Sequence, residues 1–495
     1  MADEFVDAAW PPGTIKLQQL LDTGHAGKDA RIILQPRPSS DPNDPLNWTS
    51  KQKTINFTLA SWYAMMVYAF VNATSPTWGP MGDELSFSSE TLTNTYAIGC
   101  ATLAVGAPML IPFALKYGSR PVYVFSSIAQ LAISIWAAKT MTVGDWWGVN
   151  ALQCWLGALC EVLIQMTIAD VFFVHQRGLM NSIYIWSQNV GGNLAVVASG
   201  FITEGQGWRW VWWWCAIFFA AQCVLFIFGF EETKYDGASA IEGRAEDIVS
   251  MPRASTGEKH NGDTNVAPKT SNSDTEAGSG EVDEVMRNPS IVHIDPNMRR
   301  KPYWQRLSMF KTSQGPWLHF LRHSYQPFLI LVSIPGVAFS AITFAITATF
   351  STVMTTASST YMLDPPYEFS ASQIGLLSLA PFIGSTLGSL VVGPLSDYVV
   401  LRLSKRNKGI YEPEMRFWCF IPFIPFFCAG AWYFAYSLAD GKHWAHVAVA
   451  YGIWGFGYAP LQSLALTYVL DAYNGKFLLL VQGCCAIIAR TDKVS

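Results

Sequence analysis

One acidic residue stands in the middle of an apolar stretch that runs from about residue 147 to residue 170. It belongs to a series with a four-residue spacing, which places its members on one face of a helix. A carboxylate in hydrocarbon is costly, so this acid is expected to face a cavity or a polar partner and to bind and release a proton. The alternative is a protonated structural glutamic acid bonded to a neighbouring helix. The series reads Gln153, Gly157, Glu161 and Gln165, and Glu161 is the proton-coupling candidate.

Aromatic and amide side chains in other apolar stretches are candidates for the wall of a binding cavity. Trp454 and Tyr458 offer flat faces for stacking, and Gln462 offers an amide for hydrogen bonding, so an amphiphilic substrate would fit them. Three Gly and one Pro in the same stretch, 446–470, predict a broken helix. The alternative is that these aromatic residues pack in a core. The predicted cavity residues are Gln165, Asn189, Trp454, Tyr458 and Gln462.

The composition assigns these side chains to a membrane protein. Hydrophobic residues make up 51% of the chain and charged residues 14%, whereas about a quarter of a soluble protein is charged. The nine Cys show neither metal-ligand spacing nor a disulfide pattern, so no metal and no cofactor are expected. The sequence contains no metal-binding His and Glu pair, phosphate loop or nucleophile elbow, which argues against an enzyme. Its basic residues are too dispersed to bind nucleic acid.

The elements that must position these side chains are membrane-spanning helices. A span needs about 20 mainly apolar residues. Ten stretches meet this requirement, and they predict an all-α polytopic membrane protein with six helices followed by four. The six lie near 55–78, 92–115, 121–140, 147–170, 180–202 and 208–230, and the four near 328–354, 374–396, 417–439 and 446–470.

A long polar segment separates the two groups of helices. Between Tyr235 and Tyr303 there is no Phe, Trp or Tyr, so this segment cannot bury enough apolar surface to fold, and it is interpreted as a largely disordered linker. The last apolar run, residues 477–489, is too short to cross a membrane comfortably. The predicted domains are an N-terminal arm (1–54), a six-helix bundle (55–230), the linker (231–326), a second, incomplete bundle (327–474) and an atypical tail (475–495).

The distribution of Lys and Arg predicts the orientation of the chain. If the N-terminal arm lies in the cytoplasm, 26 of the 32 Lys and Arg fall on the cytoplasmic side, as expected for short loops next to spans. The plasma membrane is the expected location. The sequon Asn72-Ala73-Thr74 then lies near the outer end of the first span, and Asn72 is a glycosylation candidate.

Two loops carry a recurring motif on the predicted cytoplasmic side. The loop after the eighth helix reads GPLSDYVVLRLSKRNKG, and the equivalent loop after the second reads IPFALKYGSRP, where Ile111 and Leu115 replace the Gly and Asp of the motif. Both resemble the signature of the major facilitator superfamily, in which a Gly-rich turn followed by Asp and basic residues locks neighbouring helices. The resemblance implies gating roles for Lys116, Gly118, Arg120, Gly393, Asp397 and Arg402.

Further motifs narrow this resemblance to the fungal drug and specialised-metabolite branch of the superfamily. They are DPNDPLNWTSKQK, TIADVFFVHQRGLMNSIY, GWRWVWW, EETKY and RNKGIYEPEMRFW, and the resemblance covers about Asp41 to Tyr473. It implies proton-driven antiport of small organic compounds, with protons, an organic substrate and the bilayer as partners. Uptake of a nutrient, organic cation or polyamine remains an alternative. Small residues predict close helix packing at Gly191, Gly200, Gly384 and Gly388.

The end of the chain departs from the family pattern. The family fold has six helices in each half, whereas this chain shows four in its second half. Without two further helices, the small-residue face at Gly99 and Gly106 is expected to lack its partner. One hypothesis is that residues 475–495 are translated intron. The alternatives are a genuine short form whose tail dips into the membrane, and a truncated protein that transports nothing.

Overall fold

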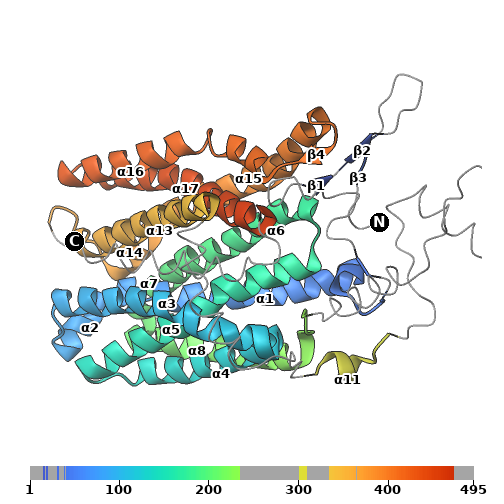
Figure 1. Cartoon of the computed structure of the whole chain (residues 1–495). Coiled ribbons are helices and arrows are strands. Elements are labelled where there is room, and N and C mark those ends of the chain that lie inside the picture. Colours follow the sequence, from blue (N-terminus) through green and yellow to red (C-terminus); the bar gives the residue numbers. More distant parts are fainter. Residues whose placement is uncertain are drawn as a thin grey trace, which may run out of the picture.

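The computed structural model consists of long helices that lie side by side (Figure 1). Most of the predicted linker (235–299 and 309–326) and the predicted tail lie outside the residues that the structure describes. The described residues are 15–16, 18–20, 30–32, 38–39, 41–234, 300–308, 334–363 and 365–472.

The first half forms six helical columns at the positions expected from the sequence. The fifth column is a composite, because a π-helical turn, η4 (Val190–Leu194), joins two α-helices. A short helix, α2 (Trp78–Leu85), follows the first column. The columns are α1 (Ser50–Asn72), α3 (Ser89–Tyr117), α4 (Ser119–Ala138), α5 (Val143–Val171), α6 (Val174–Asn189) with α7 (Ala195–Gln206), and α8 (Trp208–Gly229).

Four more columns form the described part of the second half. The first is α13 (Pro335–Tyr361), and the second joins α14 (Ala371–Leu377) to α15 (Leu379–Arg406). The third is bent by 46° between the 3₁₀ helix η5 (Pro413–Cys419) and α16 (Ile424–Ala439). The fourth is α17 (Trp444–Ala472).

The fold class predicted from the sequence is confirmed. Seven helices of the described residues are long and apolar enough to cross a membrane, or eight if the bent pair is counted as one span. The strands of the described residues are short. β1 (Ile15–Lys16) pairs with β4 (Ile410–Tyr411), and β2 (Gln18–Leu20) pairs with β3 (Ala30–Ile32).

Helix α5 is the centre of the first bundle. In its most apolar part 83% of the residues are buried, against 39–56% in the other six of the seven helices long and apolar enough to cross a membrane. Its neighbour α3 approaches closely, because a Cβ on Gly106 would collide with the carbonyl of Trp155, and one on Gly99 would lie 2.9 Å from the Cys154 sulfur. The prediction that Gly99 and Gly106 lack a partner is therefore wrong, since α5 covers both.

The predicted break in the stretch 446–470 is also wrong. Helix α17 is continuous from Trp444 to Ala472, with Pro460 inside it. Its glycines serve packing instead, since a Cβ on Gly455 would lie 2.6 Å from the carbonyl oxygen of Pro381 in α15, and one on Gly457 2.5 Å from the backbone of α16. The irregular columns are the fifth and the ninth, at η4 and at the bend before α16.

The four glycines predicted to pack helices each lie against the backbone of another element. Gly191 faces Met65 of α1, and Gly200 faces Ala371 at the start of α14. Gly384 and Gly388 both face α17. A side chain at any of these positions would collide with a neighbouring main chain, so close approach of the backbones depends on glycine.

Candidate binding cavity

A cavity of about 160 Å³ lies where the two halves of the chain meet. Helices α1, α3, α5 and α6 with η4 form one side, and α13 and α17 form the other. The end that holds the loops at 117–118 and 407–413 is called the inner end here, and the opposite end, with α2 and α14, the outer end (Figure 1). The cavity therefore has walls from both bundles.

Glu161 lies in the wall of this cavity and is only 6% exposed. The Tyr68 hydroxyl of α1 donates a hydrogen bond of 2.6 Å to its Oε1 atom. The two helices come close because Gly157, one turn before Glu161, leaves room for Val67 of α1. Glu161 is the sole Asp, Glu, Lys, Arg or His among the described residues that line the cavity. A single carboxylate therefore determines its charge.

An aromatic wall from α17 faces the same space. The rings of Trp454 and Tyr458 are stacked, with centroids 4.6 Å apart and planes 23° apart, and Tyr451 lies 5.6 Å from Trp454 on the other side. The indole Nε1 of Trp454 is buried and has no hydrogen-bond partner among the described residues. This wall offers stacking surface and one unused donor to a ligand, as expected for Trp and Tyr in binding sites.

Amide side chains complete the lining, with one exception to the prediction. Asn189, next to the π-helical turn, and Gln462 of α17 both line the cavity. Gln165 does not line it, although the sequence predicts that it should. Gln165 lies one turn closer to the inner end and is fully buried, and neither of its amide atoms has a hydrogen-bond partner among the described residues.

Several lining residues were not predicted from the sequence. They are polar or aromatic residues in spans, and no spacing pattern distinguishes them from core residues. Their only signal is polarity within an apolar stretch, which many packed residues share. Examples are Tyr96, Cys100, Gln188, Thr355 and Tyr451.

Asn72 lines the cavity as well, at the last turn of α1. Its side-chain amide donates a hydrogen bond of 2.9 Å to the Tyr68 carbonyl. A glycan acceptor must be exposed, and this half-buried amide is already engaged inside the protein. The structure therefore argues against the predicted glycosylation at Asn72.

A cluster of buried charges closes the inner end. Arg416 of η5 lies 2.7 Å from Asp471 of α17, and Arg177 of α6 lies 3.7 Å from the same carboxylate. The side chains of all three have no exposed surface. Because Arg177 belongs to the first bundle and Asp471 to the second, this cluster joins the two bundles.

Asp397 also reaches the other bundle. The sequence predicts it in a loop after the eighth helix, but it lies inside α15, about two and a half turns before the inner end of that helix. Its Oδ2 atom accepts a hydrogen bond of 3.1 Å from the backbone N–H of Leu179 in α6, and its Oδ1 atom lies 3.6 Å from Arg416. Gly393 packs close to Ser182 of α6. Arg402 is exposed, and its guanidinium donates a hydrogen bond to the Tyr398 hydroxyl of the same helix. This contact does not cross the boundary between the two bundles, called the seam here.

Two side-chain hydrogen bonds separate the charged cluster from the cavity. The Asn181 amide donates to the Thr467 hydroxyl at 2.9 Å, and the hydroxyls of Ser182 and Ser463 lie 3.0 Å apart. Both pairs join α6 to α17 and are buried. Together with the charged cluster they form the inner seal, which is several layers thick.

The first motif loop has a different arrangement. Gly118 has φ = 101°, a conformation that favours glycine, and the next helix begins directly after it. Glu232 accepts hydrogen bonds from the backbone N–H groups of Ser119 and Arg120, at 3.1 and 3.0 Å. The Arg120 guanidinium donates to the Ile227 carbonyl at 2.7 Å. Arg120 also donates to the carbonyl of Leu307, in the segment between the two halves, and none of these contacts reaches the second bundle.

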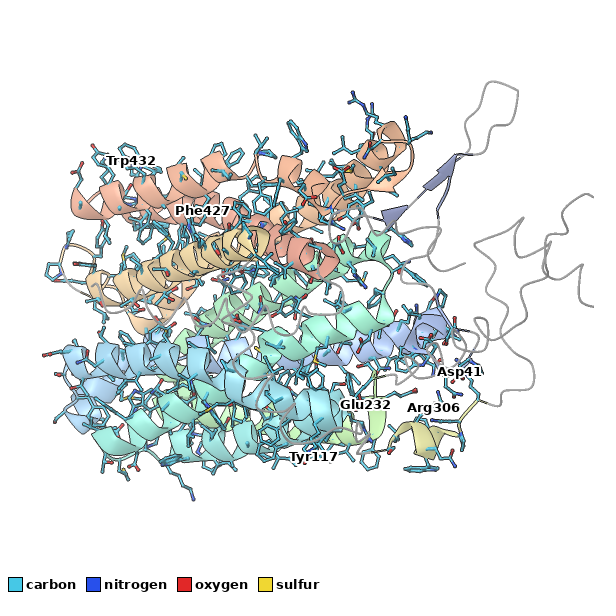
Figure 2. The ribbon with its side chains drawn as sticks, in the orientation of Figure 1. Asp41, Tyr117, Glu232, Arg306, Phe427 and Trp432 are labelled. Atoms are coloured by element: carbon cyan, nitrogen blue, oxygen red, sulfur yellow. The ribbon has the colours of Figure 1, made fainter. Side chains whose placement is uncertain are left out.

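Figure 2 shows Tyr117 and Glu232 gathered at the inner end of the first bundle, together with Arg306. Arg306 lies 3.2 Å from Glu231. Lys116, another predicted gating residue, is placed over the Tyr117 ring. The sequence assigns Glu231 and Glu232 to the linker, but their contacts make them part of the first bundle.

The outer end is closed by backbone contacts and a few hydrogen bonds. Gly200 of α7 packs on the backbone of α14, and the backbone N–H of Ser372 donates to Glu204 at 2.9 Å. The hydroxyls of Ser75 and Ser359 are hydrogen-bonded to each other. No ion pair joins the two halves at this end among the described residues.

Two helical bundles with a cavity between them are the arrangement of a secondary membrane transporter. The pattern of the Major Facilitator Superfamily matches residues 59–489, which include part of the tail 475–495. The chain belongs to this superfamily.

Individual relatives support this assignment. An uncharacterized MFS-type transporter of Schizosaccharomyces pombe is 30% identical over 96% of this chain and 84% of its own length. Protein HOL1 of Saccharomyces cerevisiae is 27% identical over 93% and 82%. Efflux pump radE of Floropilus chiversii is 22% identical over 92% and 75%. Among solved structures, the proton:xylose symporter XylE has a TM-score of 0.54 and 12% identity, and the match covers 89% of this chain and 87% of XylE.

Proposed function

We propose that this transporter exports a small organic compound in exchange for protons, with Glu161 as the proton-binding group. The observation that carries the proposal is the position of Glu161. Among the described residues that line the cavity, it is the only Asp, Glu, Lys, Arg or His. An intramembrane carboxylate in a cavity is a common carrier of protons. The names of two relatives, an efflux pump and an MFS antiporter of Candida albicans, favour export.

The proposed cycle uses one carboxylate for two ligands. Ionised Glu161, which Tyr68 holds by a hydrogen bond, attracts a substrate with a positive or polarised group. Protonation removes the negative charge and weakens that attraction, so the substrate leaves on the side where the proton enters. Trp454 and Tyr458 contribute stacking in either state. Competition for Glu161 thus couples the two flows in opposite directions.

Uptake of a small organic cation is the second candidate. The cavity combines one carboxylate with aromatic faces, which is the chemistry that binds alkylammonium groups. The orientation proposed for both candidates has the N-terminal arm in the cytoplasm, because most basic residues lie at that end. The proposed location is the plasma membrane.

Transport in inside-out vesicles tests the assignment of Glu161. With an acidic lumen and tetraphenylphosphonium as an aromatic cation probe, an exporter accumulates the probe and an importer does not. We expect Glu161→Gln to lower proton-driven accumulation about tenfold or more, because the amide cannot bind the proton. The matched control is Gln165→Ala, which alters the same helix outside the cavity. Unchanged pH-dependent transport in Glu161→Gln, at equal protein level, would refute the role of Glu161.

A further inference from the structure

A short segment near the end of the predicted linker, residues 300–308, lies against the inner end of the first bundle. It contains a helix of one turn, α11 (Tyr303–Arg306). Figure 1 shows α11 on the side of the first bundle that is remote from α16 and α17. The segment has no place in the cavity wall, so transport as proposed above assigns it no role.

Hydrogen bonds fix both ends of α11 to the place where the apolar helix α8 ends. The Tyr303 hydroxyl donates to the carbonyl of Phe228, in the last turn of α8. The Arg120 guanidinium of α4 donates to the Ile227 carbonyl of α8 and to the Leu307 carbonyl directly after α11. Helices α4 and α8 contribute no residue to the cavity wall, so the segment is held away from the seam.

The level of α11 in the bilayer follows from its contact with α8. Helix α8 is one of the helices long and apolar enough to cross a membrane, and Val224, Leu225 and Phe228 in its last turns are all exposed. Exposed apolar side chains on such a helix face lipid. Because Tyr303 bonds to the carbonyl of Phe228, α11 lies where the hydrocarbon gives way to the lipid headgroups.

Two aromatic side chains of α11 are exposed at this level. Tyr303 is 43% exposed and Trp304 is 73% exposed, and their rings meet edge to face with centroids 5.7 Å apart. Tyr and Trp are enriched at membrane interfaces, because each joins an apolar ring to a polar tip. The two rings are therefore placed for insertion between lipid headgroups.

Two basic residues directly precede α11. Arg300 and Lys301 are both exposed, and neither forms an ion pair within the described part of the chain. The Arg300 guanidinium donates to the Gln52 side chain at 2.9 Å, and the backbone N–H of Lys301 donates to the Asn43 side chain at 2.9 Å. These neutral partners hold the two residues in place without cancelling their charge.

The acids beside this basic pair are engaged by other groups. Arg300, Lys301 and Arg306 line a pocket of about 50 Å³ together with Glu231 and Glu232. Glu231 lies 3.2 Å from Arg306, and Glu232 accepts hydrogen bonds from the backbone N–H groups at the start of α4. The positive charges of Arg300 and Lys301 therefore remain for an anion from outside the protein.

We propose that residues 300–306 bind anionic phospholipids of the leaflet at the inner end. Arg300 and Lys301 contact the headgroup phosphates, while Tyr303 and Trp304 lie among the headgroups. Basic residues beside exposed aromatic rings at this depth fit a lipid surface better than a protein partner. The proposal depends on the chain crossing a membrane and not on the substrate, the direction of transport or the role of Glu161.

A lipid titration of the full chain in detergent tests the basic pair. Phosphatidylserine should raise the melting temperature, whereas phosphatidylcholine and inorganic phosphate should not. We expect the double variant Arg300→Gln, Lys301→Gln to need about tenfold more phosphatidylserine, or beyond, for the half-maximal rise. The matched control, Lys405→Gln with Arg406→Gln, removes two exposed charges at the inner end of the second bundle. Equal midpoints for the two double variants, or an equal rise with inorganic phosphate, would overturn the proposal.

The same titration tests the aromatic side chains. Trp304→Ala removes the most exposed ring of α11, and we expect the phosphatidylserine midpoint to rise about fivefold because its apolar surface no longer enters the interface. The matched control is Trp418→Ala, which removes an equally large ring that is 67% exposed on η5 of the second bundle. A similar midpoint for both variants would contradict a role for Trp304.

Photo-cross-linking locates the bound lipid directly. Phosphatidylserine with a diazirine on its headgroup, in vesicles that contain the full chain, should label the peptide with residues 300–308. We expect about tenfold less label on this peptide in the Arg300→Gln, Lys301→Gln variant. Because label is counted on one peptide, a loss of overall stability does not mimic this result. Absence of label from this peptide in the parent protein would refute the proposal and leave the surface to a protein partner.

Discussion

The two motif loops at the inner end occupy equivalent places in the two halves but make different contacts. The loop at Gly118 is bound by Glu232, which accepts from the start of α4 in the same bundle. The second motif is bound to the other bundle through the inner part of α15, because Asp397 in that helix accepts from Leu179 of α6. The contrast arises from one sequence difference. The second motif has an acidic residue, Asp397, whereas the equivalent position of the first motif is Leu115.

We expect this difference to separate an effect on stability from an effect on gating. The contacts of Glu232 persist when the bundles move apart, since both partners belong to one bundle. The contacts of Asp397 and of the Arg177–Asp471 pair must break when the inner end opens. Changes in the first loop should therefore alter only the free energy of unfolding, whereas changes in the second should also alter how often the inner end opens.

The largest effect is expected for Arg416→Ala. This change leaves the buried carboxylate of Asp471 without its nearest cation and Asp397 without an ion-pair partner. Removal of one member of a buried ion pair costs about 3–5 kcal/mol. We expect a much lower melting temperature of the purified protein in detergent. Arg402→Ala, an exposed change on the same side, serves as control and should stay within about 0.5 kcal/mol. Similar melting temperatures of the two variants would contradict the stabilising role of Arg416 in the charged cluster.

A smaller effect on stability, but a distinct effect on gating, is expected for Asp397→Asn. The amide can still accept from Leu179, but the charge that faces Arg416 is lost, which costs about 2 kcal/mol. The bond from Leu179 joins the two bundles, so its weakening should favour opening of the inner end. In a Ser463→Cys background, where the thiol lies in the inner seal, we expect the rate of its labelling by a maleimide added from the inner side to rise several-fold. An unchanged labelling rate would show that the second loop does not hold the seal.

The smallest effect is expected for Glu232→Gln. Loss of the charge at the start of α4 weakens the hydrogen bonds from Ser119 and Arg120 and costs about 1 kcal/mol. The melting temperature should fall slightly, while the labelling rate of Ser463→Cys stays at the parental value. If Glu232→Gln changes labelling as much as Asp397→Asn does, the two loops are not different in the way proposed.

Much of the architecture could be predicted because it depends on composition and periodicity. Apolar stretches of about 20 residues located the ten helical columns, and the spacing around Glu161 placed it on a helix face. The prediction of helix breaks failed because glycine and proline occur both at breaks and in close helix packing. Glycine and proline in α17 suggested a break, but they serve close packing against α15 and α16. The π-helical turn η4 carried no signal that separates it from an α-helix.

The hydrogen-bond partners of the candidate site residues could not be predicted from the sequence either. Tyr68 lies 93 positions from Glu161 in the chain, so only the approach of α1 to α5 brings its hydroxyl to the carboxylate. Gln165 shares the four-residue spacing of Glu161, yet the cavity ends before it reaches Gln165, which lies one turn closer to the inner end. A helix face can be predicted from spacing, but the depth at which that face meets a cavity depends on the neighbouring helices.

The amino-acid sequence by itself determined that this chain crosses a membrane repeatedly, that its helices fall into two groups, and that Glu161 is an acid in an apolar span. These properties follow from local hydrophobicity and spacing along one helix. The tertiary structure decided which residues face the cavity, which loop bridges the bundles, and that the N-terminal arm meets strand β4. These properties depend on contacts between distant segments, and such contacts arise only when whole helices pack against one another.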